Sequence, residues 1–377
     1  MQDSQPLAVS RQPSAVSRRQ NSPFPFRLSP SRSAFTLTEL LIVIAIIAVL
    51  AGLIAAAAVN ALKRGRETRI TLEMQNMSGA IENFKNDPNI GGVYPCSVAY
   101  AANPSAAQLK QAKADLTRTF SKMFGRANEP SLAVIINKLS GDTTATGTKN
   151  FGGHLEGGMS PSEALVFWLG GFSSDQALPL SGTGGPSYLT GPGLVEVLEG
   201  RKLAYEFDLG RLGPRNPDTG QFSGRYIEYP DPATPTTMRR INLWTYTPAG
   251  SEVPFAYFDV SRIKPSTCST KFGPPLNNIA SLPWARSNPL VDTSVLITPL
   301  REPIESMPNA DPMVFADTKF VHQDKFQILH PGLDDDWDEV DAQTFGKVLF
   351  PAGPFIGPIA DTLTNFTDGT LESASEE

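Results

Sequence analysis

A long apolar run directly after a carboxylate constrains this chain more than any other feature. Residues 40–62 contain 23 residues without a charged side chain, and Glu39 immediately precedes them. An apolar stretch of about 20 residues can cross the hydrocarbon core of a bilayer as a helix. A carboxylate at the edge of such a stretch is costly unless it finds a partner. The run therefore predicts a membrane-spanning helix in which Glu39 requires a counter-charge.

The residues before the apolar run are basic, whereas the chain of 377 residues as a whole has a net charge of −6. Residues 1–34 carry five arginines against Asp3, a net charge of +4, so the rest of the chain carries −10. Nucleic-acid affinity comes mainly from neutralising phosphates, so such an acidic remainder predicts no nucleic-acid partner.

Three interpretations compete for the segment 35–62. A cleaved secretory signal could end near Ala58 to Ala61, but both the leader and the apolar run are longer than such signals require. A plain single-pass anchor explains the length and the hydrophobicity and leaves Glu39 unexplained. The third interpretation uses the order of residues around Glu39: a small residue, Ala34, then an aromatic residue, Phe35, then Thr-Leu-Thr-Glu.

The stretch AFTLTELLIVIAIIAVLAGLIAAAA resembles the class III signal of type IV pilins and type II secretion pseudopilins. The resemblance implies that a prepilin peptidase cuts between Ala34 and Phe35, that Phe35 is then N-methylated, and that Glu39 is the fifth mature residue. Ala34 stands where the family usually has glycine, and it keeps the position small.

Cleavage would place a cationic amine on Phe35. In a bundle of such helices, Glu39 of one subunit can pair with the amine of the next, and a buried charge pair of this kind is well suited to fixing register. The resemblance thus implies three kinds of partner: other pilin or pseudopilin subunits, the prepilin peptidase, and an inner-membrane assembly platform. Basic residues flank the span equally on both sides, so its orientation follows from the resemblance alone. The leader is expected in the cytoplasm and the globular part in the periplasm of a bacterium.

Beyond residue 62 the apolar residues follow a helical pattern. Ile70, Met74, Met77, Ile81 and Phe84 recur at spacings of 4, 3, 4 and 3, which predicts one buried stripe of an amphipathic helix. Asp87-Pro88 ends the pattern. A single helix is therefore expected over 35–86, with a transmembrane half at 35–62 and an amphipathic half at 63–86. Its end also resembles the pseudopilin helix and the turn after it, on Ala80, Phe84, Lys85, Gly92, Tyr94 and Pro95.

The remaining chain predicts a globular α+β domain over 87–366, followed by an acidic disordered tail at 367–377. Ser160, Pro161 and Glu163 form a capping-box pattern that predicts a helix from 160 to 169. Further helices are expected at 105–124, 130–139 and 192–202, with Pro/Gly-rich loops between the elements. Antiparallel strands are expected at 203–209, 225–229, 239–247, 253–260 and 325–329. The pilin resemblance implies that this sheet packs on the exposed half of the long helix.

An acidic loop is the candidate metal site. Six acidic residues lie within 334–341, and Asp334, Asp336 and Asp338 have the spacing that begins an EF-hand. Glu339 and Phe345 occupy the positions of the glycine and the last ligand, so the loop is not an EF-hand. Segments 251–260 and 325–341 resemble the C-terminal part of major pseudopilins, which bind calcium there. The alternative is a solvated acidic face.

The cysteines and histidines point to no recognisable catalytic centre. Cys96 and Cys268 could form one disulfide in an exported domain, or remain two buried thiols. His154, His322 and His330 have no nucleophile motif beside them, so no enzyme is expected.

Three functional classes follow from these observations. The first is a structural subunit of a type II secretion pseudopilus-like filament, the second a type IV pilus or DNA-uptake pilin, and the third a membrane-anchored enzyme or binding protein that carries a pilin-type signal. The acidic mature chain and the C-terminal resemblance favour the first. The length exceeds that of a typical major pseudopilin and favours a minor or tip subunit, whereas the largest minor subunits usually lack the glutamate found here as Glu39.

Overall fold

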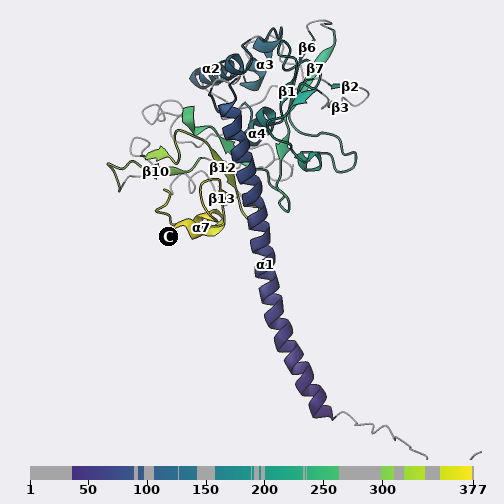
Figure 1. Ribbon diagram of the computed structural model, residues 1–377, viewed down its shortest axis with the longest axis vertical. Helices are drawn as coiled ribbons and strands as arrows, with labels where there is room; N and C mark the ends of the chain where they lie inside the picture. Colours follow the sequence, from purple (N-terminus) through teal and green to yellow (C-terminus); the bar gives the residue numbers. More distant parts are fainter. Residues whose placement is uncertain are drawn as a thin grey trace, which may run out of the picture. The chain divides into compact units, whose positions relative to one another are not determined.

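A single long helix, α1, begins the fold and is shared by two compact units, Met1–Ala57 and Ala58–Glu377. The computed structural model describes residues 36–88, 92–96, 106–125, 127–141, 158–187, 189–190, 195–196, 200–231, 234, 236–262, 299–309, 318–335 and 349–375. Helix α1 spans Leu37–Asn86, a length of 50 residues (Figure 1). The predicted long N-terminal helix is therefore confirmed.

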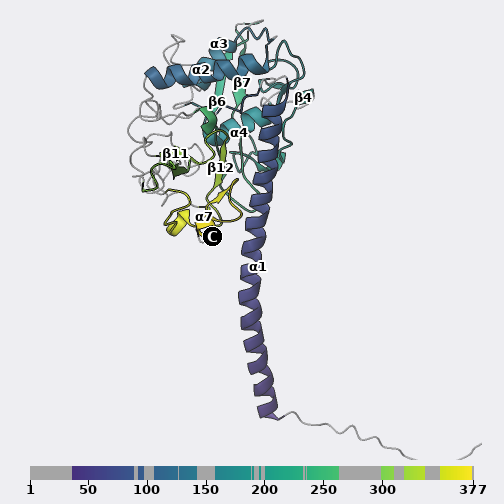
Figure 2. The ribbon, with the colours of Figure 1, turned by 60° about the vertical axis from the view of Figure 1, so that its left-hand side comes forward.

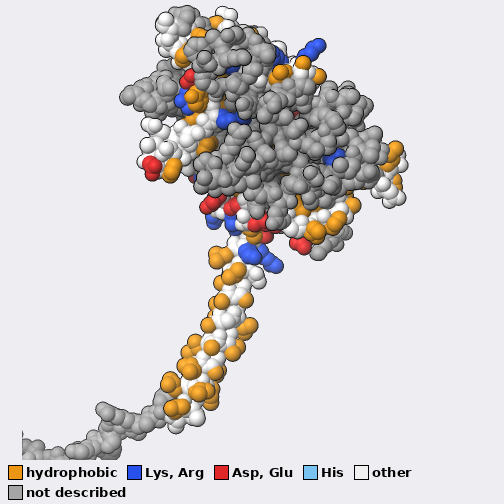
Figure 3. Space-filling view, turned by 180° about the vertical axis from the view of Figure 1, so that it is seen from behind, with side chains coloured by type: hydrophobic (Ala, Val, Ile, Leu, Met, Phe, Trp, Pro, Cys, Tyr) orange, Lys and Arg blue, Asp and Glu red, His pale blue; other side chains and the backbone are white. Residues whose placement is uncertain are grey.

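The first unit contains the apolar part of α1. From Leu37 to Ala57 every side chain is exposed, and apolar side chains cover the surface of the helix (Figure 3). This part of α1 is long and apolar enough to cross a membrane.

The second unit buries the predicted stripe of α1. Ile70, Met74, Met77 and Ile81 are fully buried, and Phe84 is 4% exposed. Full burial of one such side chain contributes roughly 1.5–3 kcal/mol, so the stripe is enough to hold this half of the helix against the rest of the unit.

Three shorter helices follow α1: α2 (Ala106–Met123), α3 (Leu132–Leu139) and α4 (Pro161–Leu169). Helix α4 begins as its sequence predicts. Ser160 Oγ accepts from the Glu163 backbone N–H at 3.2 Å, and the Glu163 carboxylate accepts from the Ser160 N–H at 2.9 Å. All nine residues of α4 are buried, which makes it the central helix of the unit (Figure 2).

The strands are short and pair only in antiparallel fashion. The described pairs are β1–β4, β2–β3, β5–β8, β6–β7 and β10–β11, and β9, β12 and β13 form a three-stranded sheet in the order β13-β12-β9. Their bounds are Phe172–Ser173 (β1), Leu189–Thr190 (β2), Val195–Glu196 (β3), Arg201–Lys202 (β4), Leu212–Gly213 (β5), Tyr226–Pro230 (β6), Met238–Asn242 (β7), Thr245–Tyr246 (β8), Ala256–Phe258 (β9), Arg301–Pro303 (β10), Thr318–Phe320 (β11), Gln327–His330 (β12) and Leu363–Thr364 (β13).

The α+β class is confirmed, but the expected single sheet is divided into six small sheets in the described part of the chain. Two local predictions were wrong. Residues 203–209 form no strand, and the helix expected at 192–202 is replaced by β3 and β4. The segment 239–247 is split into β7 and β8, which pair with different partners.

An aromatic cluster around α4 forms the centre of the core. Trp168 is fully buried, and its ring centroid lies 5.0 Å from that of Phe120, 5.8 Å from that of Phe172 and 6.5 Å from that of Phe84. The indole N–H donates to the Cys96 carbonyl at 2.9 Å. This cluster therefore joins α1, α2, α4 and β1 through one side chain.

The C-terminus corrects the expectation of a disordered tail. Helix α7 covers Leu371–Ser375, and Leu371 is fully buried. The Leu371 backbone N–H donates to the Thr362 carbonyl at 3.0 Å, which holds the start of α7 close to β13 and β12 (Figures 1 and 2). The Glu372 N–H also donates to the Ala360 carbonyl at 2.9 Å, so a buried leucine and two backbone hydrogen bonds hold this otherwise polar segment.

Candidate functional site

The N-terminal end of α1 carries the predicted assembly residue, Glu39. Thr36 is the N-cap of the helix and Glu39 its third residue. The Thr36 backbone N–H donates to the Glu39 carboxylate at 2.9 Å, and the Glu39 backbone N–H donates to Thr36 Oγ1 at 3.2 Å. These two bonds form a capping box. Ala34 and Phe35, the residues of the predicted cleavage, lie outside the described residues.

The capping box gives the Glu39 carboxylate a partner within its own chain. The Thr36 hydroxyl also donates to it at 2.8 Å, so two donors from one residue contact the same carboxylate oxygen, Oε2. The contact between Thr36 and Glu39 was not predicted, although Thr36-Leu37-Thr38-Glu39 is the Ser/Thr-x-x-Glu pattern that marks such a box. The side chain of Glu39 is exposed, so it remains accessible to a second partner.

The acidic loop is described at Asp334 and Asp335, whereas Asp336 and Asp338 lie outside the described residues. Asp335 is held by distant groups: its carboxylate pairs with the Arg66 guanidinium of α1 and accepts from the Ser251 hydroxyl. Arg66 also donates to the Leu333 carbonyl at 2.7 Å. Within the part of the chain that the structure describes, no group of three or more potential ligands could hold a metal ion.

A neighbouring aspartate keeps one oxygen without a partner. Asp361 Oδ2 accepts from the Leu333 N–H at 2.8 Å, while among the described residues Asp361 Oδ1 is buried and has no hydrogen-bond partner. Burial raises the pKa of the Asp361 carboxyl group, and the backbone N–H groups of Leu333 and Asp334 oppose that shift. A buried carboxylate oxygen without a donor, adjacent to an acidic loop, is compatible with a hard cation such as calcium.

Ser251, His330 and Asp335 lie together, but they do not form a catalytic triad. The Gly332 N–H donates to His330 Nδ1 at 3.1 Å, so the proton of the neutral ring is on Nε2, which lies 2.9 Å from Ser251 Oγ. The imidazole therefore donates to the serine and cannot accept its proton. Asp335 bonds the serine hydroxyl, and its nearest oxygen is 4.0 Å from the imidazole Nε2. This network binds the acidic loop to β12 and the loop that carries Ser251.

The stability of this region is expected to depend on pH through His330. Burial lowers the pKa of His330 to about 4, against the attraction of the Asp335 carboxylate. In the unfolded chain the pKa of this histidine is about 6.5, so between pH 6.5 and 4 the unfolded chain binds more protons than the folded protein does. The contribution of His330 to stability is therefore fully present above pH 6.5 and is lost as the pH falls to 4. The loss amounts to about 3 kcal/mol and is measured by urea unfolding across this pH range.

Two variants isolate the contribution of His330. Between pH 6.5 and 4, the free energy of unfolding of His330→Gln should decrease by about 3 kcal/mol less than that of the unsubstituted protein, since glutamine does not titrate. His322→Gln, at an exposed turn, is the comparison: partial burial and the neighbouring Lys325 lower the pKa of His322 as well, so this variant should change the pH profile in the same direction and by less than His330→Gln does. An unchanged profile in His330→Gln would contradict the assignment.

Cys96 is buried with a free thiol, and burial raises its pKa far above the usual range. Cys268 lies outside the described residues, so the possible disulfide between Cys96 and Cys268 stays a prediction. A buried neutral thiol is a weak nucleophile, so Cys96 serves the core through packing.

The comparison with known protein families matches the N-terminal segment. The model of the prokaryotic N-terminal methylation motif covers residues 29–55, which include Ala34, Phe35 and Glu39. Comparison with curated proteins and with solved structures gives no match. The chain therefore carries the signal that is typical of type IV pilins and pseudopilins. Such a signal implies processing by a prepilin peptidase and assembly with other pilin subunits, and the exposed apolar helix fits anchoring in the inner membrane.

Proposed function

We propose that this protein is a structural subunit of a type II secretion pseudopilus-like filament, in a minor or tip position. The observation that carries the proposal is Glu39 at the start of an exposed apolar helix, within a matched methylation motif. The apolar part of α1 anchors the subunit in the inner membrane before assembly, with the leader in the cytoplasm and the globular unit in the periplasm.

Assembly follows from the chemistry of the helix start. In the anchored subunit Thr36 satisfies the Glu39 carboxylate. When the subunit joins a filament, the amine of a neighbouring Phe35 pairs with Glu39, because a cation offsets the carboxylate's charge in an apolar layer and a neutral hydroxyl does not. The pairing sets the axial position of each subunit against the next.

Processing is tested by the intact mass of the protein purified from the membrane. We expect a chain that begins at Phe35 and carries one N-methyl group. Ala34→Gly should be processed at least as completely, since glycine is the usual residue of this signal, and Ala34→Leu should accumulate the uncut form. A membrane protein that begins at Met1, or after Ala61, would contradict the proposal.

We also propose that the acidic loop binds calcium through Asp334, Asp336 and Asp338. The partnerless Asp361 oxygen supports a cation at this place. Calcium at about 100 times its dissociation constant should stabilise the protein by about 2.7 kcal/mol and raise the melting temperature by about 5 °C relative to a chelator.

The control for calcium binding is the double variant Asp336→Asn, Asp338→Asn. It should melt at the same temperature with calcium and with chelator. Equal melting temperatures in the unsubstituted protein would remove the calcium proposal and leave the assembly proposal untouched.

A further inference from the structure

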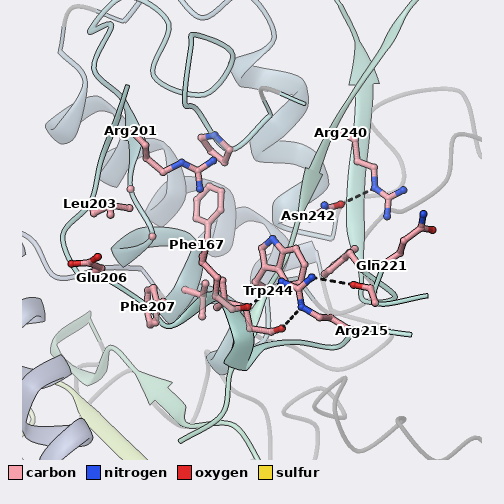
Figure 4. A pocket seen from close by; sticks show the side chains of 18 of the residues that line it. Phe167, Arg201, Leu203, Glu206, Phe207, Arg215, Gln221, Arg240, Asn242 and Trp244 are labelled. Atoms are coloured by element: carbon pink, nitrogen blue, oxygen red, sulfur yellow. Dashed lines mark hydrogen bonds between the residues drawn. The ribbon is translucent and has the colours of Figure 1, made fainter. Parts of the chain in front are cut away.

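A cavity of about 490 Å³ lies in the second unit, apart from both regions discussed above. It opens between the C-terminal end of α4, the segment from β4 to β5, the loop 215–222, and strand β7 with the following Trp244 (Figure 4). Its volume falls within the range of about 300–1,000 Å³ that is usual for small-molecule pockets.

The walls of the cavity are largely aromatic and aliphatic. Phe167 and Phe207 are buried, and Trp244 is half-buried opposite them (Figure 4). At the mouth, Leu203 and Leu209 are 49% and 51% exposed. Large exposed apolar side chains around a cavity lined by aromatic rings are typical of a binding surface. A molecule bound there would remove these side chains from water, which is favourable.

One wall of the cavity is a ladder of arginines and aromatic rings. The Arg240 guanidinium lies 3.5 Å from the Tyr226 ring centroid and 5.7 Å from that of Phe222. Phe222 meets Trp244 edge to face at 4.4 Å, and Arg215 lies 4.6 Å from the Trp244 centroid. Stacking of this kind holds both guanidinium groups in place at the cavity.

The charges of Arg215 and Arg240 are not neutralised by the groups that hold them. Arg215 donates to three backbone carbonyls, those of Leu209, Leu212 and Gly220, and Arg240 donates to the Asn242 side-chain oxygen at 2.8 Å. All of these acceptors are neutral. Neither arginine takes part in an ion pair with another described residue.

The hydrogen-bonding capacity of these arginines is only partly used. A guanidinium has five N–H donors, and the bonds described use three on Arg215 and one on Arg240. The cavity therefore combines an apolar interior with fixed cations that retain donors. Glu206 is the one acidic side chain among the described lining residues, and it is exposed.

We propose that this cavity binds a small amphipathic carboxylate, whose apolar body packs against Phe167, Phe207 and Trp244 and whose carboxylate pairs with Arg215, the guanidinium group that stacks on Trp244. Arg240, which stacks on Tyr226 and Phe222, adds positive charge farther along the same wall. Aromatic walls favour a flat ring system, and guanidinium groups suit a carboxylate because the two can form parallel charge-assisted hydrogen bonds. The proposal is independent of filament assembly, since no residue of the cavity belongs to the methylation motif.

The test is isothermal titration calorimetry on the full chain in phosphatidylcholine nanodiscs, with empty nanodiscs subtracted. Naphthylacetate is the probe, and naphthylacetamide is the neutral control of the same shape. We expect naphthylacetate to bind about tenfold or more tightly than the amide, since a hydrogen bond to a charged group adds at least that factor. Acetate, which lacks the ring, should give no measurable binding.

Arginine variants locate the site. Arg215→Gln should weaken naphthylacetate about tenfold and leave the affinity for naphthylacetamide unchanged, which also shows that the cavity remains folded. Arg240→Gln, which removes a more distant charge, should weaken naphthylacetate by less than Arg215→Gln does. Arg118→Gln, an exposed arginine of α2, is the matched control and should change neither affinity. The proposal is overturned by equal affinities for the two naphthyl compounds, by an equal loss in Arg118→Gln, or by the absence of naphthylacetate binding.

Discussion

Glu39→Gln is expected to leave the protein in the membrane and to lower its incorporation into filaments by about 100-fold or more. Glutamine keeps an oxygen that can accept from the Thr36 N–H, so the capping box is preserved while the charge is removed. The neighbour's amine would then lie in an apolar layer without its counter-charge, and breaking a buried pair in this way costs about 3–5 kcal/mol. Quantitative immunoblotting of sheared filaments against the membrane fraction measures the effect.

The reciprocal variant, Thr36→Val, separates capping from charge pairing. It removes the hydroxyl that contacts Glu39 and keeps the carboxylate, and loss of an N-cap costs about 1 kcal/mol. We expect assembly to fall by less than about tenfold. If Thr36→Val abolished assembly and Glu39→Gln assembled normally, the cap and not the charge would be the essential feature.

Trp168→Ala is expected to destabilise the second unit by about 3–5 kcal/mol, the usual cost of removing a large aromatic side chain from a core. Trp168 is fully buried and contacts rings from α1, α2 and β1, so several elements lose contacts together. Urea unfolding of the detergent-solubilised protein, followed by circular dichroism, measures the change.

Trp168→Phe serves as the graded control. It keeps an aromatic ring and removes the N–H that donates to the Cys96 carbonyl, so it should cost about 1–3 kcal/mol. A Trp168→Ala variant within about 1 kcal/mol of the unsubstituted protein would show that the cluster can collapse around the vacant space, against our interpretation of α4 as the central helix.

Local sequence patterns predicted helices α1 to α4 well, whereas the helix expected at 192–202 is absent and α7 was not predicted. The stripe from Ile70 to Phe84 is buried as its spacing required, and the Ser160–Glu163 box starts α4. The sheet was predicted less well. Alternating apolar residues indicated strands, but the partner of each strand depends on distant residues, and β7 and β8 took different partners although they are almost adjacent.

The sequence alone determined the N-terminal signal of this protein, because the methylation motif, the apolar span and Glu39 are contiguous and act locally. The tertiary structure decided the rest. It brought Arg66 to Asp335 across 269 positions, and it joined α4, β4 and β7 around one cavity. Residues that meet in this way share no local period, since their proximity follows from the packing of whole elements around the buried side chains of α4.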